Sequence, residues 1–397
     1  MSTALMQIRT VHPFPARMAP ELALASLEGL NANSIVLDPM SGSGTVLRQA
    51  LALGHHAIGF DMDPLAVLMS RVSTTEIDPA CVQTELIDLL AEADFVDLRT
   101  ERLDWQDAET KAFIKYWFAQ PQRRELARLA VVLARRRAAN LGAKRRAAVD
   151  VLQIALSRII VTKEQCASLA RDTSHSRPHR VASTSSFKVR EGFLRSVGLI
   201  VRRMDGVSPG ARIRIDTGDA RRMAITDNSV DAIMTSPPYL NAIDYMRGHR
   251  MSLVWLGYSI KELRTIRSTS VGAERGTDAE GAEITDIASA MCDCSQLSGR
   301  HSRMLNRYAD DLRLMMRDAA RVLRPGGTAT YVVGNSCLKG VFIRNSDGVA
   351  HAGRFAGLTL IEERERNLPA NSRYLPMTDA GTLSKRMCTE TILRFTR

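Results

Sequence analysis

The residues with the most specific chemistry form the run Thr235-Ser236-Pro237-Pro238-Tyr239. Each proline fixes its own φ and lacks a backbone N–H, so the carbonyl groups of Ser236 and Pro237 can face a cavity without a local donor. With the Ser236 hydroxyl, these oxygens can accept hydrogen bonds from an amino group and turn its nitrogen lone pair toward an electrophile. Tyr239 offers a flat face on which a heterocyclic base can stack. The alternative is a proline-rich turn with a packed tyrosine.

A short apolar segment precedes this run and is expected to position it. Residues 230–234, Val-Asp-Ala-Ile-Met, have the length and composition of a buried strand. The proline run then follows the carboxyl end of that strand, where open α/β sheets bind their ligands. The position therefore agrees with the chemistry.

A second candidate site follows an earlier apolar run, Ser34–Leu37, which is expected to be the first strand. Residues 38–45 (DPMSGSGT) form a tight turn into a helix, in which two glycines let the backbone approach a ligand and the helix N-terminus offers amides to a carboxylate. The spacing departs from G-x-G-x-x-G, and Asp38 would repel a pyrophosphate. The loop thus favours a methionine-bearing cofactor over a dinucleotide, and an ordinary glycine-rich turn is the alternative.

An acidic pair ends the next expected strand, His56–Phe60, about twenty residues beyond the glycines. A βαβ unit holds a ribose by its hydroxyls with an acid at this position. Asp61 is the first candidate for that role and Asp63 the second. The other acid is expected to cap the following helix.

These motifs resemble those of the DNA amino-methyltransferases, which use S-adenosylmethionine and carry a (D/N/S)-P-P-(Y/F/W) motif. The serine form is most similar to enzymes that methylate N4 of cytosine, and residues 38–45 look like the family's D-P-x-x-G-S-G-T loop. Residues 12–20 resemble the motif that packs over the cofactor. Asp219 resembles the acid that binds the adenine amino group, with a turn aspartate that caps its own loop as the alternative.

The resemblance implies two sets of site residues. The catalytic set is Ser236, Pro237, Pro238 and Tyr239. The cofactor-binding set is Phe14, Arg17, Asp38, Pro39, Gly42, Gly44, Thr45, Asp61, Asp63, Asp219 and Ala220.

The expected fold class is α/β: a Rossmann-like methyltransferase fold with a mostly parallel seven-stranded sheet, helices on both faces and a large helical insertion. The domain holding the cofactor loop spans residues 1–76 and continues at 211–397 with the catalytic motif. The helical insertion occupies 77–210. A segment at about 265–303 has no firm period and is expected to be a flexible loop.

The charge of the chain points to a polyanionic partner. Its formal net charge is +11 and its pI is near 9.7, and basic side chains cluster in the insertion, as at Arg135–Arg137 and Lys144–Arg146. Such a patch is the electrostatic footprint of phosphate binding. A helical subdomain with merely solvated charges is the alternative.

Other features exclude several classes of protein. No apolar run is long enough to cross a membrane and no signal peptide is visible, which predicts a cytoplasmic protein. The six cysteines are scattered without a CxxC pair, so neither a disulfide framework nor a metal site is expected.

The sequence therefore predicts S-adenosylmethionine-dependent methylation of an exocyclic amino group in double-stranded DNA, most simply N4 of cytosine, after base flipping. The alternatives are an N6-adenine enzyme, a methyltransferase acting on tRNA or rRNA, a non-catalytic nucleic-acid-binding module, and a dinucleotide-dependent oxidoreductase. The resemblance adds a restriction or defence protein as a candidate partner. The sequence favours no oligomeric state.

Overall fold

The computed structural model describes residues 10–14, 18–171, 178–204, 211–240, 244–273, 279–368 and 388–397. The chain forms two compact units. The sheet unit comprises residues 16–62, 208–243 and 268–397, and the helical unit comprises residues 1–15, 63–207 and 244–267.

The sheet unit is built on seven strands in the order β10-β11-β7-β6-β1-β2-β5. All neighbours are parallel except β11, which runs antiparallel to both β7 and β10. The fold class predicted from the sequence is confirmed. The strands are β1 (Ile35–Asp38), β2 (His56–Asp61), β5 (Ile213–Thr217), β6 (Val230–Thr235), β7 (Leu323–Gly334), β10 (Thr359–Asn367) and β11 (Thr389–Thr396).

The strand order reverses between β1 and β6. From β1 the chain continues outward to β2 and β5 on one side, and β6 then starts the other side of the sheet. The two strands pair in parallel through Val36 with Ala232 and Leu37 with Ile233. Ligands bind at such a switch point, outside the carboxyl ends of the two strands.

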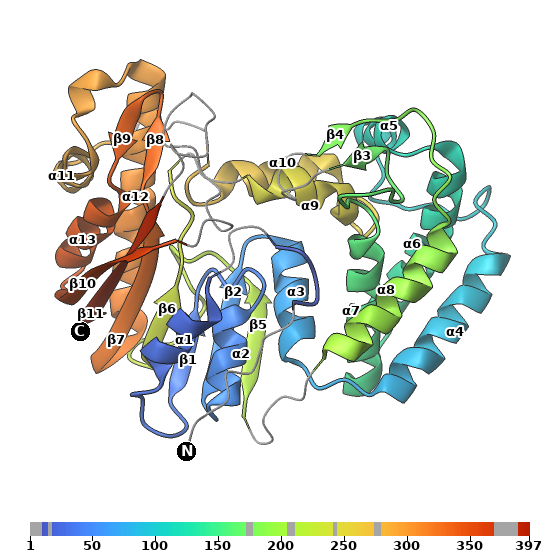
Figure 1. Ribbon diagram of the computed structural model, residues 1–397, viewed down its shortest axis with the longest axis horizontal. Coiled ribbons are helices and arrows are strands. Elements are labelled where there is room, and N and C mark those ends of the chain that lie inside the picture. The colour runs from blue at the N-terminus through green and yellow to red at the C-terminus, as the bar shows by residue number, and fades with distance from the viewer. Residues whose placement is uncertain are drawn as a thin grey trace. The chain divides into compact units, whose positions relative to one another are not determined.

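Helices cover both faces of this sheet (Figure 1). One layer is formed by α1 (Pro20–Leu27) and α2 (Thr45–Ala52), which contact each other and the strands β1, β2 and β6. The other is formed by α12 (Gly299–Val322) and α13 (Asn345–Phe355), which contact each other and β7, β10 and β11. A small hairpin, β8 (Ser336–Leu338) with β9 (Val341–Ile343), follows β7.

The segment expected to be a flexible loop differs from that expectation. It contains α11 (Ala282–Met291) and a short 3-10 turn, η1 (Cys294–Gln296), before α12 begins at Gly299. Ile284, Ile287 and Met291 recur at helical spacing and are buried in the core of the sheet unit. The many Gly, Ser and Thr residues around them hid this period.

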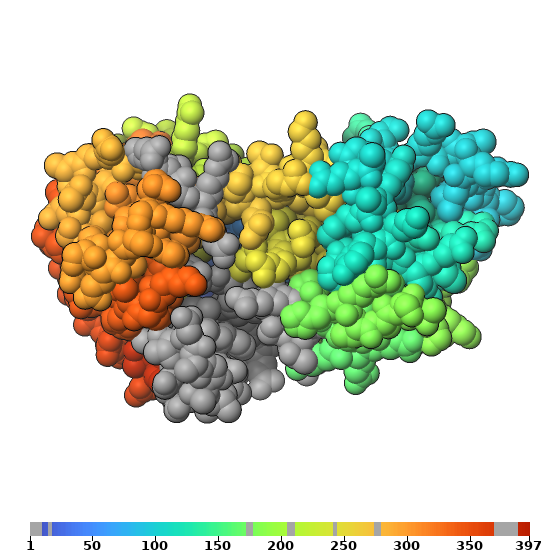
Figure 2. Space-filling model, turned by 90° about the horizontal axis from the view of Figure 1, so that it is seen from above, coloured from blue at the N-terminus to red at the C-terminus, as the bar shows by residue number. Residues whose placement is uncertain are grey.

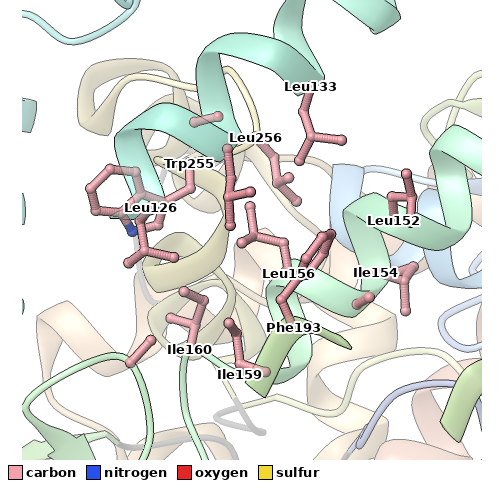
Figure 3. Packing of buried hydrophobic residues seen from close by; sticks show 14 of the residues in the cluster. Leu126, Leu133, Leu152, Ile154, Leu156, Ile159, Ile160, Phe193, Trp255 and Leu256 are labelled. Atoms are coloured by element: carbon pink, nitrogen blue, oxygen red, sulfur yellow. The ribbon is translucent and has the colours of Figure 1, made fainter. Parts of the chain in front are cut away.

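The helical unit has its own hydrophobic core, part of which Figure 3 shows. Trp255 packs edge-on against Phe118, with ring centroids 5.2 Å apart, although the two residues are far apart in sequence. The unit therefore needs residues 244–267 as well as the insertion. Its elements are α3 (Pro64–Thr74), α4 (Pro79–Phe95), α5 (Ala108–Trp117), α6 (Gln120–Ala138), α7 (Ala143–Arg158), β3 (Ala170–Arg171), β4 (His179–Arg180), α8 (Val189–Arg203), α9 (Tyr245–Leu253) and most of α10 (Ile260–Thr269).

Figure 2 shows one face of the molecule, on which residues of the helical insertion appear in cyan to green. Among the residues that the structure describes, no helix is both long and apolar enough to cross a membrane.

Candidate active site

The two sequence motifs of the sheet unit meet at the switch point. Thr235, the last residue of β6, donates from its hydroxyl to Asp38 Oδ1 at 2.8 Å. The backbone N–H of Met40 donates to the same carboxylate oxygen at 3.2 Å. Asp38 ends β1, so this carboxylate ties the start of the glycine loop to the start of the proline run.

Asp38 is a buried acid, only 3% exposed. Burial raises its pKa to about 7, and the charge of Asp61 adds to that effect, whereas the hydrogen bonds from Thr235 and Met40 oppose it. A carboxyl group of this kind costs folding free energy when ionised. Because the ionised Asp38 carboxyl lowers the stability of the fold, Asp38 is a candidate for a role in ligand binding.

The loop between β1 and α2 contains two glycines in the left-handed backbone region. Gly42 has φ 51° and Gly44 has φ 80°, a region that residues with a Cβ enter only at a cost. The N–H of Gly42 donates to Asp61 Oδ2 at 2.9 Å, and Ser41 N–H donates to the carbonyl of Phe60 at 2.8 Å. The end of β2 thus fixes the loop, while Pro39 and Thr45 are buried at its two sides.

The two acids after β2 have different surroundings. Asp61 belongs to the sheet unit and accepts from Gly42, as described above. Asp63 belongs to the helical unit, where it caps α3 by accepting from Leu65 N–H at 2.9 Å and pairs with Nδ1 of His249. Asp63 is thus the capping acid of the pair, and the expected ribose contact of Asp61 stays a prediction.

Phe14 also belongs to the helical unit. Its ring stacks on Tyr245 with centroids 4.9 Å apart and an interplanar angle of 12°, and lies 5.8 Å from the ring of His249. The expected cofactor contact of Phe14 stays a prediction. Arg17 lies outside the described residues.

Asp219 is engaged by its own loop. Its carboxylate accepts from the Arg221 backbone N–H at 2.9 Å and from the Arg221 guanidinium at 2.6 Å. Arg221 also pairs with buried Asp311 on α12 at 2.5 Å and donates to the carbonyl of Thr269. These contacts correspond to the alternative of a turn aspartate, and Ala220 beside it is buried in the core.

The hydroxyl of Ser236 is oriented by the neighbouring strand. It donates to the carbonyl oxygen of Val332 on β7 at 2.9 Å. A carbonyl can only accept, so the Ser236 hydrogen is committed to it and the hydroxyl oxygen is left to act as an acceptor. The acceptor role toward an amine that the sequence assigned to Ser236 stays a prediction.

Tyr239 is half-buried against the core of the sheet unit. Burial, followed by the charge of Glu390, raises the pKa of its phenol to about 12, although hydrogen bonds with Ser236 and the Gly334 backbone oppose the shift. The phenol therefore stays protonated at neutral pH.

The second proline of the run is fixed by α12. Tyr308, which is fully buried, donates its hydroxyl to the carbonyl oxygen of Pro238 at 2.9 Å. Pro237 is buried, and among the residues that the structure describes no donor meets its carbonyl oxygen. One of the two proline carbonyls is thus occupied and the other has a free acceptor position.

The sheet unit brings together the ends of β1, β2 and β6, and with them the glycine loop, Asp61 and the proline run. Two contributors, Tyr308 and Arg221, escaped the sequence reasoning. The signal for Tyr308 was weak: it is a polar residue on the largely apolar, core-facing side of α12, as is Asp311, the partner of Arg221. In the described part of the chain, no group of three or more His, Cys, Asp or Glu residues could hold a metal ion.

Comparison with known proteins bears on these motifs. A family model described as a DNA methylase, of the N6/N4 methyltransferase type, matches residues 9–71. The chain is 31% identical over 84 residues to Type II methyltransferase M.MjaII of Methanocaldococcus jannaschii, covering 21% of this chain and 16% of the relative. It is 37% identical over 82 residues to Type II methyltransferase M.MvaI of Kocuria varians, covering 20% and 18%. The chain thus aligns with less than a fifth of the length of either relative.

A solved structure of an S-adenosylmethionine-dependent methyltransferase from Methanosarcina mazei aligns with 96% of this chain and 98% of its own, at 7% identity and a TM-score of 0.34. A similarity this weak supports no conclusion about function. The family model and the curated relatives agree with the motifs described above, and the matched segments of the chain are similar to DNA amino-methyltransferases.

Proposed function

We propose that this chain transfers a methyl group to an exocyclic amino group of a base in double-stranded DNA, with N4 of cytosine as the preferred target. One observation carries the proposal: the hydrogen bond of 2.8 Å between Thr235 and Asp38 joins the proline run to the glycine loop at the switch point of the sheet. Acceptors for an amine and a loop suited to the cofactor therefore belong to one compact unit.

The cofactor of the family fits the residues of the loop. S-adenosylmethionine supplies, when bound, a methyl group on a positively charged sulfur. The left-handed glycines 42 and 44 leave the backbone accessible, and the α2 N-terminus has no side-chain cap, which suits the carboxylate of an amino acid. Asp61 is placed to hold ribose hydroxyls beside this loop. Asp38 adds a carboxyl group that favours a cationic ligand when ionised.

The proline run acts on the amine. The Ser236 oxygen and the Pro237 carbonyl accept the two amino hydrogens, which turns the nitrogen lone pair toward the methyl group. In this proposal the nitrogen would bond to the methyl carbon as the carbon–sulfur bond breaks, the sulfur would keep that electron pair as a neutral thioether, and the nitrogen would release one proton to solvent. Because Val332 and Tyr308 fix Ser236 and Pro238, the acceptors need no rearrangement when charge develops on the nitrogen. A cysteine nucleophile is not required.

The target base has to leave the DNA stack to reach these acceptors. In this proposal its ring stacks on Tyr239. Tyr239 is half-buried against the core of the sheet unit, which restricts its side chain and lowers the entropy cost of presenting the ring to a base.

The preference for cytosine rests on the serine form of the motif, and the alternatives are N6 of adenine in DNA or a base in RNA. To separate them, the purified protein is incubated with radiolabelled cofactor and either duplex DNA or total RNA, and the product is digested to nucleosides. We expect the label in N4-methyl-2′-deoxycytidine from DNA. Label in N6-methyl-2′-deoxyadenosine from DNA would change only the target base.

Label in RNA alone would overturn DNA as the substrate. Cofactor binding measured by calorimetry in the same preparation provides the control, since a chain that binds S-adenosylmethionine but labels neither polymer would be a binding module. Selective binding of a dinucleotide would instead support an oxidoreductase.

A further inference from the structure

The helical unit contains a pocket with an unusual concentration of arginines. Its volume is about 470 Å³, and it is lined by Arg71, Arg137, Arg146, Asp150, Gly257 and Tyr258. All six residues belong to this one unit. They come from three helices, α3, α6 and α7, and from the segment between α9 and α10.

One of the three arginines is paired with an acid. Arg71 Nε lies 3.1 Å from Asp150 Oδ2, and the Asp150 side chain is 9% exposed. Gln153 also donates to Asp150, at 3.1 Å. Burial raises the pKa of Asp150, and the nearby charges of Arg71 and Arg146 oppose the shift. The single carboxylate of the pocket is thus already engaged.

The other two arginines are bonded to neutral groups. Arg146 donates to the carbonyl oxygens of Arg137 and Ala139 at the end of α6, at 3.0 and 2.8 Å. Arg137 donates to the carbonyl oxygen of Leu256. Because carbonyls orient a guanidinium without neutralising it, the lining keeps two more positive charges than negative ones.

Gly257 lets Arg137 reach this position. Its φ is 100°, and a Cβ added to it would lie 2.0 Å from Nη2 of Arg137. The Arg137 guanidinium therefore occupies the space that any larger residue at 257 would fill. The arrangement depends on a glycine at this point of the chain.

Tyr258 adds a hydroxyl beside the guanidinium groups. Burial raises its pKa, and the charges of Arg137 and Arg71 act against that shift. The charges of Asp63 and Glu262 raise the pKa of the same phenol, but neither residue is among those that line the pocket. The phenol stays protonated and can donate to an anion.

We propose that this pocket binds a phosphate group. Guanidinium forks match the tetrahedral oxygens of phosphate, and their hydrogen bonds are strengthened by charge. The group can come from the backbone of DNA or from free phosphate. Its assignment to DNA rests on the proposed function, whereas the anion site itself does not.

The test uses the full chain with single substitutions. Arg137→Gln and Arg146→Gln each remove one charge from the pocket. Arg195→Gln removes one charge from α8 of the same unit, where the side chain is 68% exposed and lies 3.8 Å from Glu191, and is the matched control. Circular dichroism checks that each variant is folded.

Two readouts are measured for each variant. The first is the thermal shift on adding inorganic phosphate. The second is the salt dependence of affinity for a short DNA duplex, for which losing one phosphate contact lowers the log–log slope by about 0.9. We expect the two pocket variants to lose the thermal shift and to show a slope lower by about 0.9 than that of the wild-type protein. Arg195→Gln should keep the wild-type thermal shift and slope.

The outcomes separate the sources of the anion. If the pocket variants lose the thermal shift but have the wild-type slope with DNA, the anion site is supported and its ligand is free phosphate. No thermal shift in the wild-type protein and equal slopes in all variants would overturn the proposal. Gly257→Ala provides a charge-neutral check, because it should displace Arg137 and reproduce the loss. Neither readout depends on methyl transfer, so failure of the proposed function would be seen separately.

Discussion

Replacing Asp38 by asparagine should stabilise the ligand-free protein at alkaline pH. The pKa of this buried carboxyl is raised from 3.8 to about 7. In the unfolded chain the group ionises near pH 4, but in the folded chain it stays protonated until near pH 7. Between these values the folded state binds more protons, so its stability falls as pH rises.

The size of the effect follows from the shift. A difference of about three pKa units corresponds to roughly 4 kcal/mol at pH 8, and to less than half of that at pH 5. Asparagine has the same shape and can still accept from Thr235, but it cannot ionise. The stability difference between Asp38→Asn and wild type should therefore grow by roughly 3 kcal/mol from pH 5 to pH 8.

The assay is chemical denaturation of both proteins at the two pH values without ligand. Any loss of stability caused by the asparagine side chain itself is the same at both pH values, so it cancels when the two stability differences are compared. A stability difference that does not change with pH would refute the assignment of a raised pKa to Asp38. Cofactor affinity should fall in the same variant, since the acid that costs stability is the one proposed to favour a cation.

Three further substitutions test the positioning of the site. Tyr308→Phe removes a buried hydrogen bond to the Pro238 carbonyl, which should lower the free energy of unfolding by about 1–2 kcal/mol. It should also lower kcat about tenfold without changing cofactor affinity. An unchanged kcat would show that α12 does not position the proline run. Gly44→Ala and Gly54→Ala, with φ of 80° and 78° at opposite ends of α2, should each lose about 1 kcal/mol in denaturation experiments. Only Gly44→Ala should weaken cofactor binding in calorimetry, and equal weakening by both would remove the loop from the site.

Much of the sheet could be predicted because its signals are local. The apolar runs before Asp38, Asp61 and Ser236 have the length of buried strands, and each is followed by a residue type that parallel sheets place at a ligand site. Those three strands lie within one or two residues of the expected bounds.

The features that the sequence did not reveal depend on contacts between distant parts of the chain. Nothing near Trp255 predicts that it packs on Phe118, so the helical unit could not be delimited from the insertion alone. The bond from Tyr308 to Pro238 likewise joins residues 70 positions apart. Arg221 likewise pairs with Asp311, 90 positions away, a contact that a local motif does not predict.

The central claim is that oxygen acceptors of the proline run activate an amine beside the cofactor loop. Its most direct test is the single-turnover rate of methyl transfer to DNA by Ser236→Ala, with cofactor affinity measured on the same sample. The account predicts an affinity close to that of the wild-type protein and a rate lower by about a hundredfold, the usual effect of removing one preorganised hydrogen-bonding group from an active site. A wild-type rate in Ser236→Ala would contradict it.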